Sequence, residues 1–311
     1  MKYQIDKELK PYCYLSLPVS SPKLAGFIGS LLKPPRKIFH DSEVHVRREG
    51  IAGYDGKEIE ILIFEPRNLD TGAPCLVYYH GGGFVFGASW HHYNVCKLYA
   101  KATPCKLIFV QYRLAPRNPH PIPVEDCYTA LSHVYNNAET LGIIKEKIAV
   151  GGDSAGGALA AAVCQMARDR GTDLPLMQML IYPVTDRRMT TESQRRYTDT
   201  PMWDSGLSKM MWRAYLGDGD VRDIQYASPM EARDFTGLPQ AYVETAEFDC
   251  LRDEGLTYAE ALKAAGVSVR INETLGTIHG FDIARRAKVT EDALRKRIEA
   301  LRSALYGEDD A

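Results

Sequence analysis

Apolar and polar residues follow two different periods along this chain, and segments of the two kinds alternate. Segment 58–64 (EIEILIF) alternates polar and apolar residues, as a strand with one exposed face does. Segments 75–79 (CLVYY) and 107–112 (LIFVQY) are continuous apolar runs, which are typical of strands buried on both faces of a parallel sheet. Further strands are predicted over 147–150, 177–182, 240–245 and 267–271, the last of them with an alternating pattern.

Helices are predicted between these strands. Four segments are rich in Ala, Leu and charged residues, namely 124–135, 155–168, 254–265 and 291–305. In the third of them Leu256, Ala259, Leu262 and Ala265 recur at every third position, which gives the helix one apolar face. The alternation of strands and helices predicts an α/β fold with a mostly parallel sheet and right-handed crossovers.

Two regions interrupt the alternation. The first forty residues contain five prolines, and the region from about 187 to 226 contains Trp203 and Trp212. Asp204 has the character of a helix start in the second region. We interpret both regions as helical additions that cover the functional edge of the sheet. A surface elaboration without function is the alternative interpretation.

Composition narrows the class of protein only slightly. The chain has 311 residues, 45% of them hydrophobic, with 38 basic and 40 acidic side chains and a formal net charge of -2. These values argue against a disordered chain, a collagen and a coiled coil. The near-zero charge gives no electrostatic reason to expect nucleic acid or a membrane surface as a partner. A soluble enzyme, a binding module and a structural domain all remain open at this point.

The N-terminus and the cysteines predict a cytoplasmic location. The first residues are charged and lack the apolar core of a secretory signal, and no stretch is long and apolar enough to span a membrane. The apolar segment 24–32 is interpreted as a helix packed on the body of the protein. Seven cysteines without a CxxC pair indicate reduced thiols. His91-His92 is the only His pair and has no zinc-like spacing to other ligands, so no metal site is expected.

The clearest local signal is the sequence GDSAGG at 152–157, which follows a predicted strand and opens a predicted helix. That context is what a G-x-S-x-G nucleophile elbow requires, with Ser154 at the sharp turn. Small residues at 152 and 156 are expected because a Cβ atom there would collide across the turn. A glycine-rich phosphate-binding turn is the competing reading, but neither G-x-G-x-x-G nor a P-loop Lys is present.

A second glycine motif, HGGGF at 80–84, follows the predicted strand 75–79. Three consecutive glycines at a strand end are expected where backbone N–H groups must point at a ligand. In acyl transfer that ligand is the oxyanion of the tetrahedral intermediate. We assign the N–H groups of Gly82, Gly83 and Ala155 as the oxyanion-hole donors. His80 is interpreted as a structural residue that holds the glycine loop.

A nucleophilic serine needs a base and an orienting acid. His279 is the favoured base, because it follows the strand 267–271 in a loop of small residues near the C-terminus, where the chain order Ser, acid, His places it. Asp249 is the favoured acid, since it follows the strand 240–245. Asp253 and Glu247 are the alternatives, Asp253 with a helix-capping role as its competing explanation.

Taken together, these motifs resemble the bacterial hormone-sensitive-lipase family (family IV) of carboxylesterases, within the α/β-hydrolase superfamily. The resemblance rests on HGGGF at 80–84, YRLAP at 112–116, GDSAGG at 152–157, DCLRD at 249–253 and HGF at 279–281. It implies one α/β-hydrolase domain over residues 1–311, with an eight-stranded, mostly parallel sheet and a helical cap from about 1–40 and 187–226. It also implies Ser154, Asp249 and His279 as a catalytic triad, without cofactor or metal. Cys250 departs from the family's usual Pro after the catalytic Asp.

The expected reaction is hydrolysis of a small-molecule ester through an acyl-enzyme intermediate. Bulky side chains near the two loops predict short acyl groups, and the candidate substrate-binding residues are Phe84, Trp90, Trp203 and Met211. An amidase or formamidase on the same scaffold is one alternative, and a non-catalytic small-molecule receptor is another. The edge strand predicted over 267–271 is a candidate contact for a homodimer.

Overall fold

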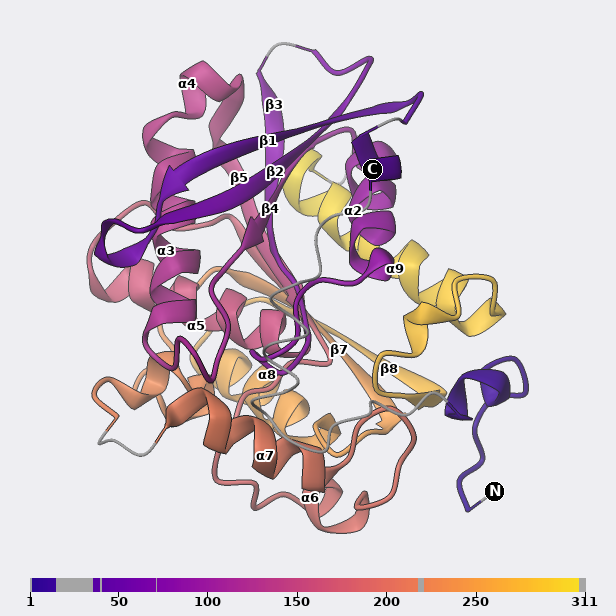
Figure 1. The fold of residues 1–311 in the computed structure, drawn as a ribbon. Coiled ribbons are helices and arrows are strands. Elements are labelled where there is room, and N and C mark those ends of the chain that lie inside the picture. The colour runs from indigo at the N-terminus through magenta and orange to yellow at the C-terminus, as the bar shows by residue number, and fades with distance from the viewer. Residues whose placement is uncertain (1, 15–35, 40, 71, 218–220, 308–311) are drawn as a thin grey trace.

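The computed structural model describes residues 2–14, 36–39, 41–70, 72–217 and 221–307. Its strands form one eight-stranded sheet in the order β1-β2-β4-β3-β5-β6-β7-β8 (Figure 1). Pairs β1–β2 and β2–β4 are antiparallel, and every other neighbouring pair is parallel. The strands are β1 (Val44–Ala52), β2 (Glu58–Pro66), β3 (Ala73–Tyr79), β4 (Lys106–Gln111), β5 (Ile143–Asp153), β6 (Met177–Ile181), β7 (Gln240–Phe248) and β8 (Val269–Ile278).

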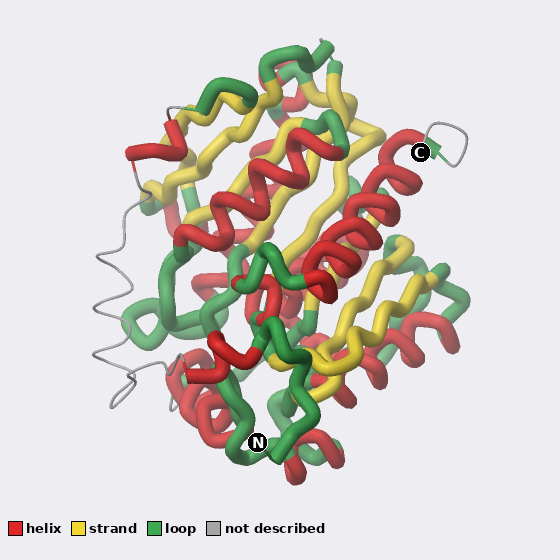
Figure 2. The backbone as a smooth tube through the Cα atoms, turned by 90° about the vertical axis from the view of Figure 1, so that its right-hand side faces the viewer, coloured by secondary structure: helices red, strands yellow, loops and turns green. Residues whose placement is uncertain are grey.

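Helices cover both faces of this sheet. Helices α2 and α9 lie together on the face that Figure 2 turns toward the viewer, and α3, α5 and α8 pack on the opposite face. Double coverage explains the continuous apolar runs, because every residue of β3 and of β6 is buried. The helices are α2 (Trp90–Ala102), α3 (Ile122–Asn136), α4 (Ala138–Leu141), α5 (Ala155–Asp169), α6 (Glu192–Arg196), α7 (Ser205–Leu216), α8 (Arg252–Ala264) and α9 (Lys288–Tyr306).

The predicted α/β fold with a mostly parallel sheet is confirmed, although strand β1 and the helices α2 and α4 were not predicted. Strand β1 was not predicted because its sequence, VHVRREGIA, carries three charged residues and its apolar and polar residues alternate only in part. Its structure depends on pairing with β2. Helix α2 was also missed, since aromatic and polar side chains such as Tyr93 and Tyr99 form its buried face.

Strand β8 corrects the predicted boundaries of the last strand. The prediction ended it at Ile271 and placed 275–278 in a loop, whereas pairing with β7 carries β8 to Ile278. A register shift between Ala246 and Phe248 accommodates the extra length. As a result, His279 follows the strand directly, and β8 occupies an edge of the described sheet.

The region 187–226 is helical in part and lies at the lower end of the sheet in Figure 1. Asp204 caps α7 as its sequence suggested, because its Oδ1 accepts the N–H of Leu207 at 2.9 Å. Of the first forty residues, 1, 15–35 and 40 lie outside the described residues, and so does the apolar segment 24–32. The described N-terminal part contacts the same region, since Tyr3 packs on Tyr197.

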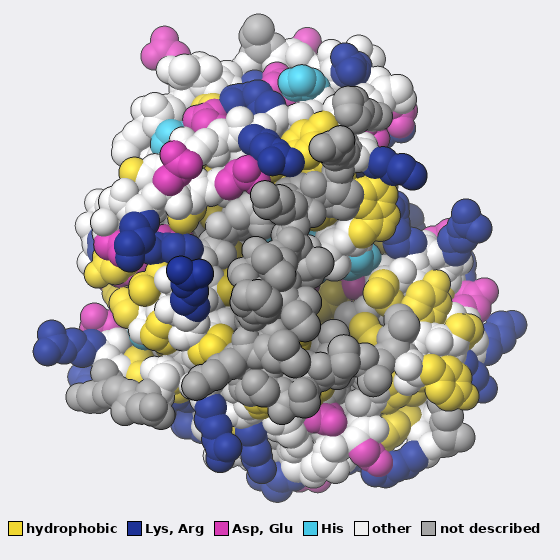
Figure 3. Space-filling view, viewed as in Figure 1, with side chains coloured by type: hydrophobic (Ala, Val, Ile, Leu, Met, Phe, Trp, Pro, Cys, Tyr) yellow, Lys and Arg dark blue, Asp and Glu magenta, His cyan; other side chains and the backbone are white. Residues whose placement is uncertain are grey.

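Surface charge is mixed on the face that Figure 3 shows, where basic and acidic side chains are interspersed. Among the described residues, no helix is long and apolar enough to cross a membrane. The described part of the chain also holds no cluster of three or more His, Cys, Asp or Glu side chains arranged for a metal ion.

Candidate active site

Ser154 occupies the sharp turn between β5 and α5. Its backbone has φ 54° and ψ −119°, a conformation that L-residues rarely adopt and that costs about 1–3 kcal/mol. Two hydrogen bonds hold it there: its N–H donates to the carbonyl of Ile181 at 2.8 Å, and its carbonyl accepts the N–H of Val184 at 3.2 Å. The turn is thus fixed by the end of β6 and the residues that follow.

The glycines on either side of Ser154 allow this turn to pack against β3. A Cβ atom at Gly156 would lie 1.9 Å from the carbonyl oxygen of Tyr79, and one at Gly152 would lie 2.5 Å from the same oxygen. Neither position therefore has room for a side chain. This agrees with the steric reason for small residues at 152 and 156 in the sequence.

Ser154, His279 and Asp249 meet in one hydrogen-bonded line. Nε2 of His279 lies 2.9 Å from Oγ of Ser154, and its Nδ1 lies 2.7 Å from Oδ2 of Asp249. All three residues directly follow strands, β5, β8 and β7, at the carboxyl edge of the sheet. The other carboxylate oxygen of Asp249 accepts the N–H of Leu251 at 3.0 Å, so the acid is held in place.

The two alternative acids have other partners. Oδ2 of Asp253 accepts the N–H of Ser193 at 2.8 Å, which ties α8 to the region 187–226. Oε2 of Glu247 accepts the N–H of Gly276 at 2.6 Å, which ties β7 to β8. The structure therefore brings Asp249, and neither of the others, to His279.

Cys250 has no features of a reactive thiol. It is fully buried, and burial raises the pKa of its thiol well above the ordinary range. Its Sγ lies 3.5 Å from Oγ of Ser208, which is its one hydrogen-bond contact within the described residues.

The glycine loop at 81–83, called the oxyanion loop below after the role predicted for it, lies against the nucleophile turn, since a Cβ atom on Gly81 would meet the carbonyl oxygen of Asp153 at 3.0 Å. Gly82 has φ +116° and Gly83 has φ +58°, values that favour glycine. The N–H of Gly81 is occupied, because it donates to Oδ1 of Asp153 at 3.1 Å. Among the described residues, nothing accepts a hydrogen bond from Gly82 or Gly83 N–H. Ala155 is the first residue of α5, where an N–H has no partner within the helix.

His80 holds the start of the oxyanion loop. Its Nδ1 lies 2.7 Å from the carbonyl oxygen of Gly81, and its ring stacks on Tyr112 at 4.4 Å between centroids. Burial, followed by nearby His92, lowers the pKa of His80 to about 4, which keeps the ring neutral near pH 7. These contacts agree with a structural role.

A small apolar cavity of about 10 Å³ adjoins the oxyanion loop at Gly83. A Cβ atom on Gly83 would meet Cη2 of Trp203 at 2.8 Å and Cγ of Met211 at 3.3 Å, so both side chains crowd this point. The Trp203 ring also lies 5.8 Å from the His279 ring. The lining residues are Gly83, Val85, Phe86, Trp203, Leu207, Met210 and Met211.

Two of the four predicted substrate-binding residues do not line this cavity. Phe84 is fully buried and stacks on Tyr215 of α7 at 3.8 Å, so it joins the oxyanion loop to α7 as part of the core. Trp90 begins α2 with 45% of its surface exposed. Sequence proximity to the glycines placed both residues near the loop but could not show which way their side chains turn.

A buried ionic network, absent from the sequence prediction, supports the His279 loop. Arg297 of α9 donates from Nη1 to Oδ2 of Asp282 at 2.6 Å and from Nε to Oε1 of Glu244 at 3.1 Å. Oδ1 of Asp282 accepts the hydroxyl of Tyr182 at 2.7 Å, and the Tyr182 ring meets the His279 ring edge-on at 4.8 Å. Burial opposes ionisation of Asp282, but Arg297 holds the pKa of Asp282 well below its usual range.

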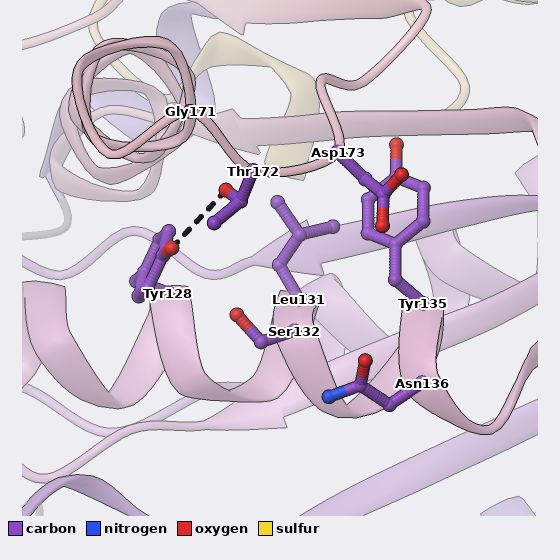
Figure 4. A pocket seen from close by; sticks show the side chains of 8 residues that line it. All are labelled: Tyr128, Leu131, Ser132, Tyr135, Asn136, Gly171, Thr172 and Asp173. Atoms are coloured by element: carbon purple, nitrogen blue, oxygen red, sulfur yellow. Dashed lines mark hydrogen bonds between the residues drawn. The ribbon is translucent and has the colours of Figure 1, made fainter.

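A larger cleft of about 430 Å³ lies elsewhere, between α3 and the loop after α5 (Figure 4). Two of its hydroxyls, those of Tyr128 and Thr172, lie 3.1 Å apart, and its carboxylate, Asp173, pairs with Lys145 at 3.0 Å. The cleft therefore presents no nucleophile with an adjacent base.

Comparison with known proteins agrees with this geometry. Residues 76–283 match a family described as alpha/beta hydrolase fold. The chain is 35% identical over 280 residues to carboxylesterase NlhH of Mycobacterium tuberculosis, covering 88% of this chain and 87% of that one. It is 32% identical over 258 residues to the ethyl acetate hydrolase of Pseudomonas putida, covering 81% and 80%.

Solved structures extend the likeness to nearly the whole chain. A bacterial heroin esterase matches with a TM-score of 0.86 at 36% identity, covering 98% of this chain and 99% of that one. The resemblance inferred from the sequence motifs is confirmed. The chain belongs to the α/β-hydrolase fold family, within its hormone-sensitive-lipase-like group of esterases.

Proposed function

We propose that this protein is a serine carboxylesterase that hydrolyses small esters with short acyl groups through an acyl-enzyme on Ser154. The observation that carries the proposal is the position of His279, whose ring bridges Ser154 at 2.9 Å and Asp249 at 2.7 Å. Ester hydrolysis is supported by the relatives, which are named a carboxylesterase and an ethyl acetate hydrolase.

In the acylation half-reaction, Nε2 of His279 takes the proton from Ser154 as Oγ attacks the ester carbonyl carbon. Asp249 holds the imidazole in the tautomer with a proton on Nδ1 and stabilises the imidazolium that forms. The carbonyl oxygen becomes an oxyanion, and the N–H groups of Gly82, Gly83 and Ala155 are the proposed donors to it. His279 then gives its proton to the leaving alkoxide oxygen, and the alcohol departs.

Deacylation repeats these roles with water. His279 removes a proton from a water molecule as the water oxygen attacks the acyl-enzyme carbonyl, and the second tetrahedral intermediate uses the same donors. Collapse of that intermediate breaks the bond to Oγ, and His279 returns the proton to Ser154. The products are a carboxylic acid and free enzyme.

The size of the acyl group follows from the crowding at Gly83. The adjacent apolar cavity is only about 10 Å³, and Trp203 and Met211 close on it. An acyl chain bound beside the proposed oxyanion donors must share this narrow space with both side chains, which favours short chains. We therefore expect acetyl to hexanoyl esters to react fastest, and the named activity of the ethyl acetate hydrolase supports an acetyl group.

Replacing the nucleophile tests the proposal. Ser154→Ala should lower kcat for p-nitrophenyl acetate by at least about 10³-fold while the thermal unfolding midpoint stays near that of the parent chain. Ser132→Ala, on the half-buried face of α3, is the matched control and should keep full activity. Unchanged turnover in Ser154→Ala would show that Ser154 is not the nucleophile.

A panel of p-nitrophenyl esters and anilides then separates an esterase from an amidase, and absence of turnover on every substrate would favour a receptor.

Location and assembly stay predictions. All seven cysteines are free, and six of them are buried, which supports the proposed cytoplasmic location. Strand β8 lies at an edge of the described sheet, and the N–H of Asp6 donates to the carbonyl of Gly276 near its end at 2.8 Å. The earlier part of β8, where the homodimer contact is predicted, remains the candidate surface. Sedimentation of the purified chain over a range of concentrations decides whether two copies associate.

A further inference from the structure

The histidine pair His91-His92 is not used by the proposed chemistry, yet both rings reach loops of the candidate site. We propose that the two histidines are positioning residues, which hold the oxyanion loop and the His279 loop at a fixed separation from one helix. The inference rests on the proposed function, because it assigns the pair a role in that same acyl transfer.

His92 reaches the oxyanion loop through Asp153, the residue before Ser154. Nε2 of His92 lies 3.2 Å from Oδ2 of Asp153. The other oxygen of Asp153 accepts the N–H of Gly81 at 3.1 Å and the hydroxyl of Tyr78 at 2.8 Å. One carboxylate therefore joins α2, the strand β3, the oxyanion loop and the nucleophile turn.

The proton position on His92 follows from its second contact. The N–H of Ser89, the residue before α2, donates to Nδ1 of His92 at 2.9 Å. A ring nitrogen that accepts a hydrogen bond carries no proton, so the proton of a neutral ring lies on Nε2. Nε2–H can then donate to Asp153. His92 thus has two separable contacts, one with the helix cap and one with the site.

His91 reaches the His279 loop through Asp282. Its Nε2 lies 3.3 Å from Oδ1 of Asp282, and its Nδ1 has no partner among the described residues. Asp282 stands three residues after His279 and also accepts the hydroxyl of Tyr182, whose ring contacts the His279 ring. The His279 ring is thus contacted by Tyr182, which follows β6, and the Tyr182 hydroxyl is held by Asp282, which His91 of α2 contacts.

One rigid element carries both contacts. Consecutive residues on a helix point about 100° apart, so neighbouring side chains can reach two different loops. Helix α2 is anchored by its buried residues, which include Tyr93, Cys96 and Tyr99. Oxyanion donors act only within about 0.5 Å of the correct distance, and a misplacement of about 1 Å can cost 10²-fold in rate. Because α2 contacts both loops, it can keep the distance between the oxyanion loop and His279 constant.

Two substitutions of His92 separate site positioning from helix capping. Asn places its amide where Nδ1 of the imidazole was, so it keeps the hydrogen bond from Ser89 and loses the contact with Asp153. Gln places its amide N–H near Nε2, which keeps Asp153 and loses Ser89. We expect His92→Asn to lower kcat for p-nitrophenyl acetate by about 10- to 100-fold with KM within about threefold, and His92→Gln to stay within about threefold of the parent. A capping role alone gives the opposite order, with the unfolding midpoint lowered in His92→Gln.

Further variants keep the test independent of folding. Asp153→Asn is isosteric and presents an N–H to His92, so it breaks the same contact and should show the same loss of kcat. His91→Asn should lower kcat and His91→Gln restore it, since only Gln reaches Asp282. The affinity of a trifluoromethyl ketone inhibitor should fall in parallel with kcat/KM, because the ketone forms the tetrahedral adduct. His45→Asn, on an exposed position of β1, is the control.

The outcomes distinguish this inference from the proposed function. Parent-like kcat in His92→Asn, Asp153→Asn and His91→Asn, with Ser154→Ala inactive, would overturn the positioning role and leave the esterase proposal standing. Equal loss in the Asn and Gln variants would also overturn it, because rescue by the retained contact is its signature. Activity in Ser154→Ala would overturn the proposed function itself.

Discussion

Single residues set the geometry of the nucleophile turn. Gly156 has its α-carbon so close to β3 that a methyl group would overlap the carbonyl oxygen of Tyr79. Ser154 holds a strained backbone conformation with positive φ, and its backbone hydrogen bonds to Ile181 and Val184 help to maintain it. Both features have the same cause, because the start of α5 packs directly against the end of β3.

Replacing Gly156 by Ala tests this requirement. The added Cβ, 1.9 Å from a backbone oxygen, must displace either β3 or the turn, so we expect a loss of stability of about 2 kcal/mol or more together with a large loss of kcat. Urea unfolding and p-nitrophenyl acetate turnover measure the two effects. Gly206→Ala in α7 is the control, since its nearest contact is a side-chain oxygen of Asp204 at 3.1 Å. Equal stability of the two variants would refute the steric argument.

Among the elements, the region 187–226 packs closely against the glycine loop at 81–83, where Trp203 and Met211 lie beside Gly83. Trp203 precedes α7, and its indole is fixed by a hydrogen bond from Nε1 to Oγ of Ser208 at 2.9 Å. Cη2 at the edge of the ring lies beside Gly83, and the ring centroid lies 5.8 Å from that of His279. The segment before α7, through Trp203, thereby limits the space beside Gly83 in the loop after β3.

Trp203→Ala should therefore change acyl-chain preference. Removal of the indole enlarges the cavity beside Gly83, so we expect the ratio of kcat/KM for octanoate over acetate esters to rise by about tenfold or more. A chain-length panel of p-nitrophenyl esters measures it. Trp212→Phe in α7 is the matched control, because Trp212 packs toward Phe84 rather than into the cavity. An octanoate-to-acetate ratio that is the same in Trp203→Ala and in the parent chain would contradict the proposed acyl site.

Across the whole molecule, the buried carboxyl of Glu254 links α8 to the loop after β6 and to α6. Glu254 of α8 accepts the N–H of Thr185 at 2.8 Å from the loop after β6, and it accepts the amide of Gln194 in α6 at 3.1 Å. Burial raises the pKa of Glu254 to about 8, despite these donors. The folded protein therefore binds a proton here at neutral pH that the unfolded chain has released.

This linkage predicts the pH dependence of stability. Because the folded-state pKa lies above the unfolded value near 4.5, the contribution is fully present below pH 4.5 and is lost as pH rises through about 8. Glu254→Gln stays neutral, so at pH 9 it should exceed the parent in unfolding free energy by a few kcal/mol, at about 1.4 kcal/mol per pKa unit. Urea unfolding at pH 5 and pH 9 tests this, with exposed Glu260→Gln on the same helix as control. Parallel pH profiles for parent and Glu254→Gln would contradict it.

The sequence pattern predicted those strands and helices whose own residues carry a clear apolar period or run. Apolar runs identified β3 and β6, which helices cover on both faces, and the Ala-rich segment after Ser154 identified α5. Strand β1 and helix α2 were missed because their residues are polar or aromatic and acquire their structure from partners distant in the sequence. The end of β8 was missed for the same reason, since only pairing with β7 extends it.

Alternating strand and helix patterns established the fold class, and the glycine motifs at 80–84 and 152–157 established which residues are offered for chemistry. Glycines at a strand end point to chemistry because they let the backbone approach a ligand closely. Tertiary structure alone decided which acid meets His279, which aromatic side chains close the cavity, and that His91, Asp282 and Arg297 join into one support. Distances between side chains on different strands and helices depend on how the layers pack, and no local pattern encodes them.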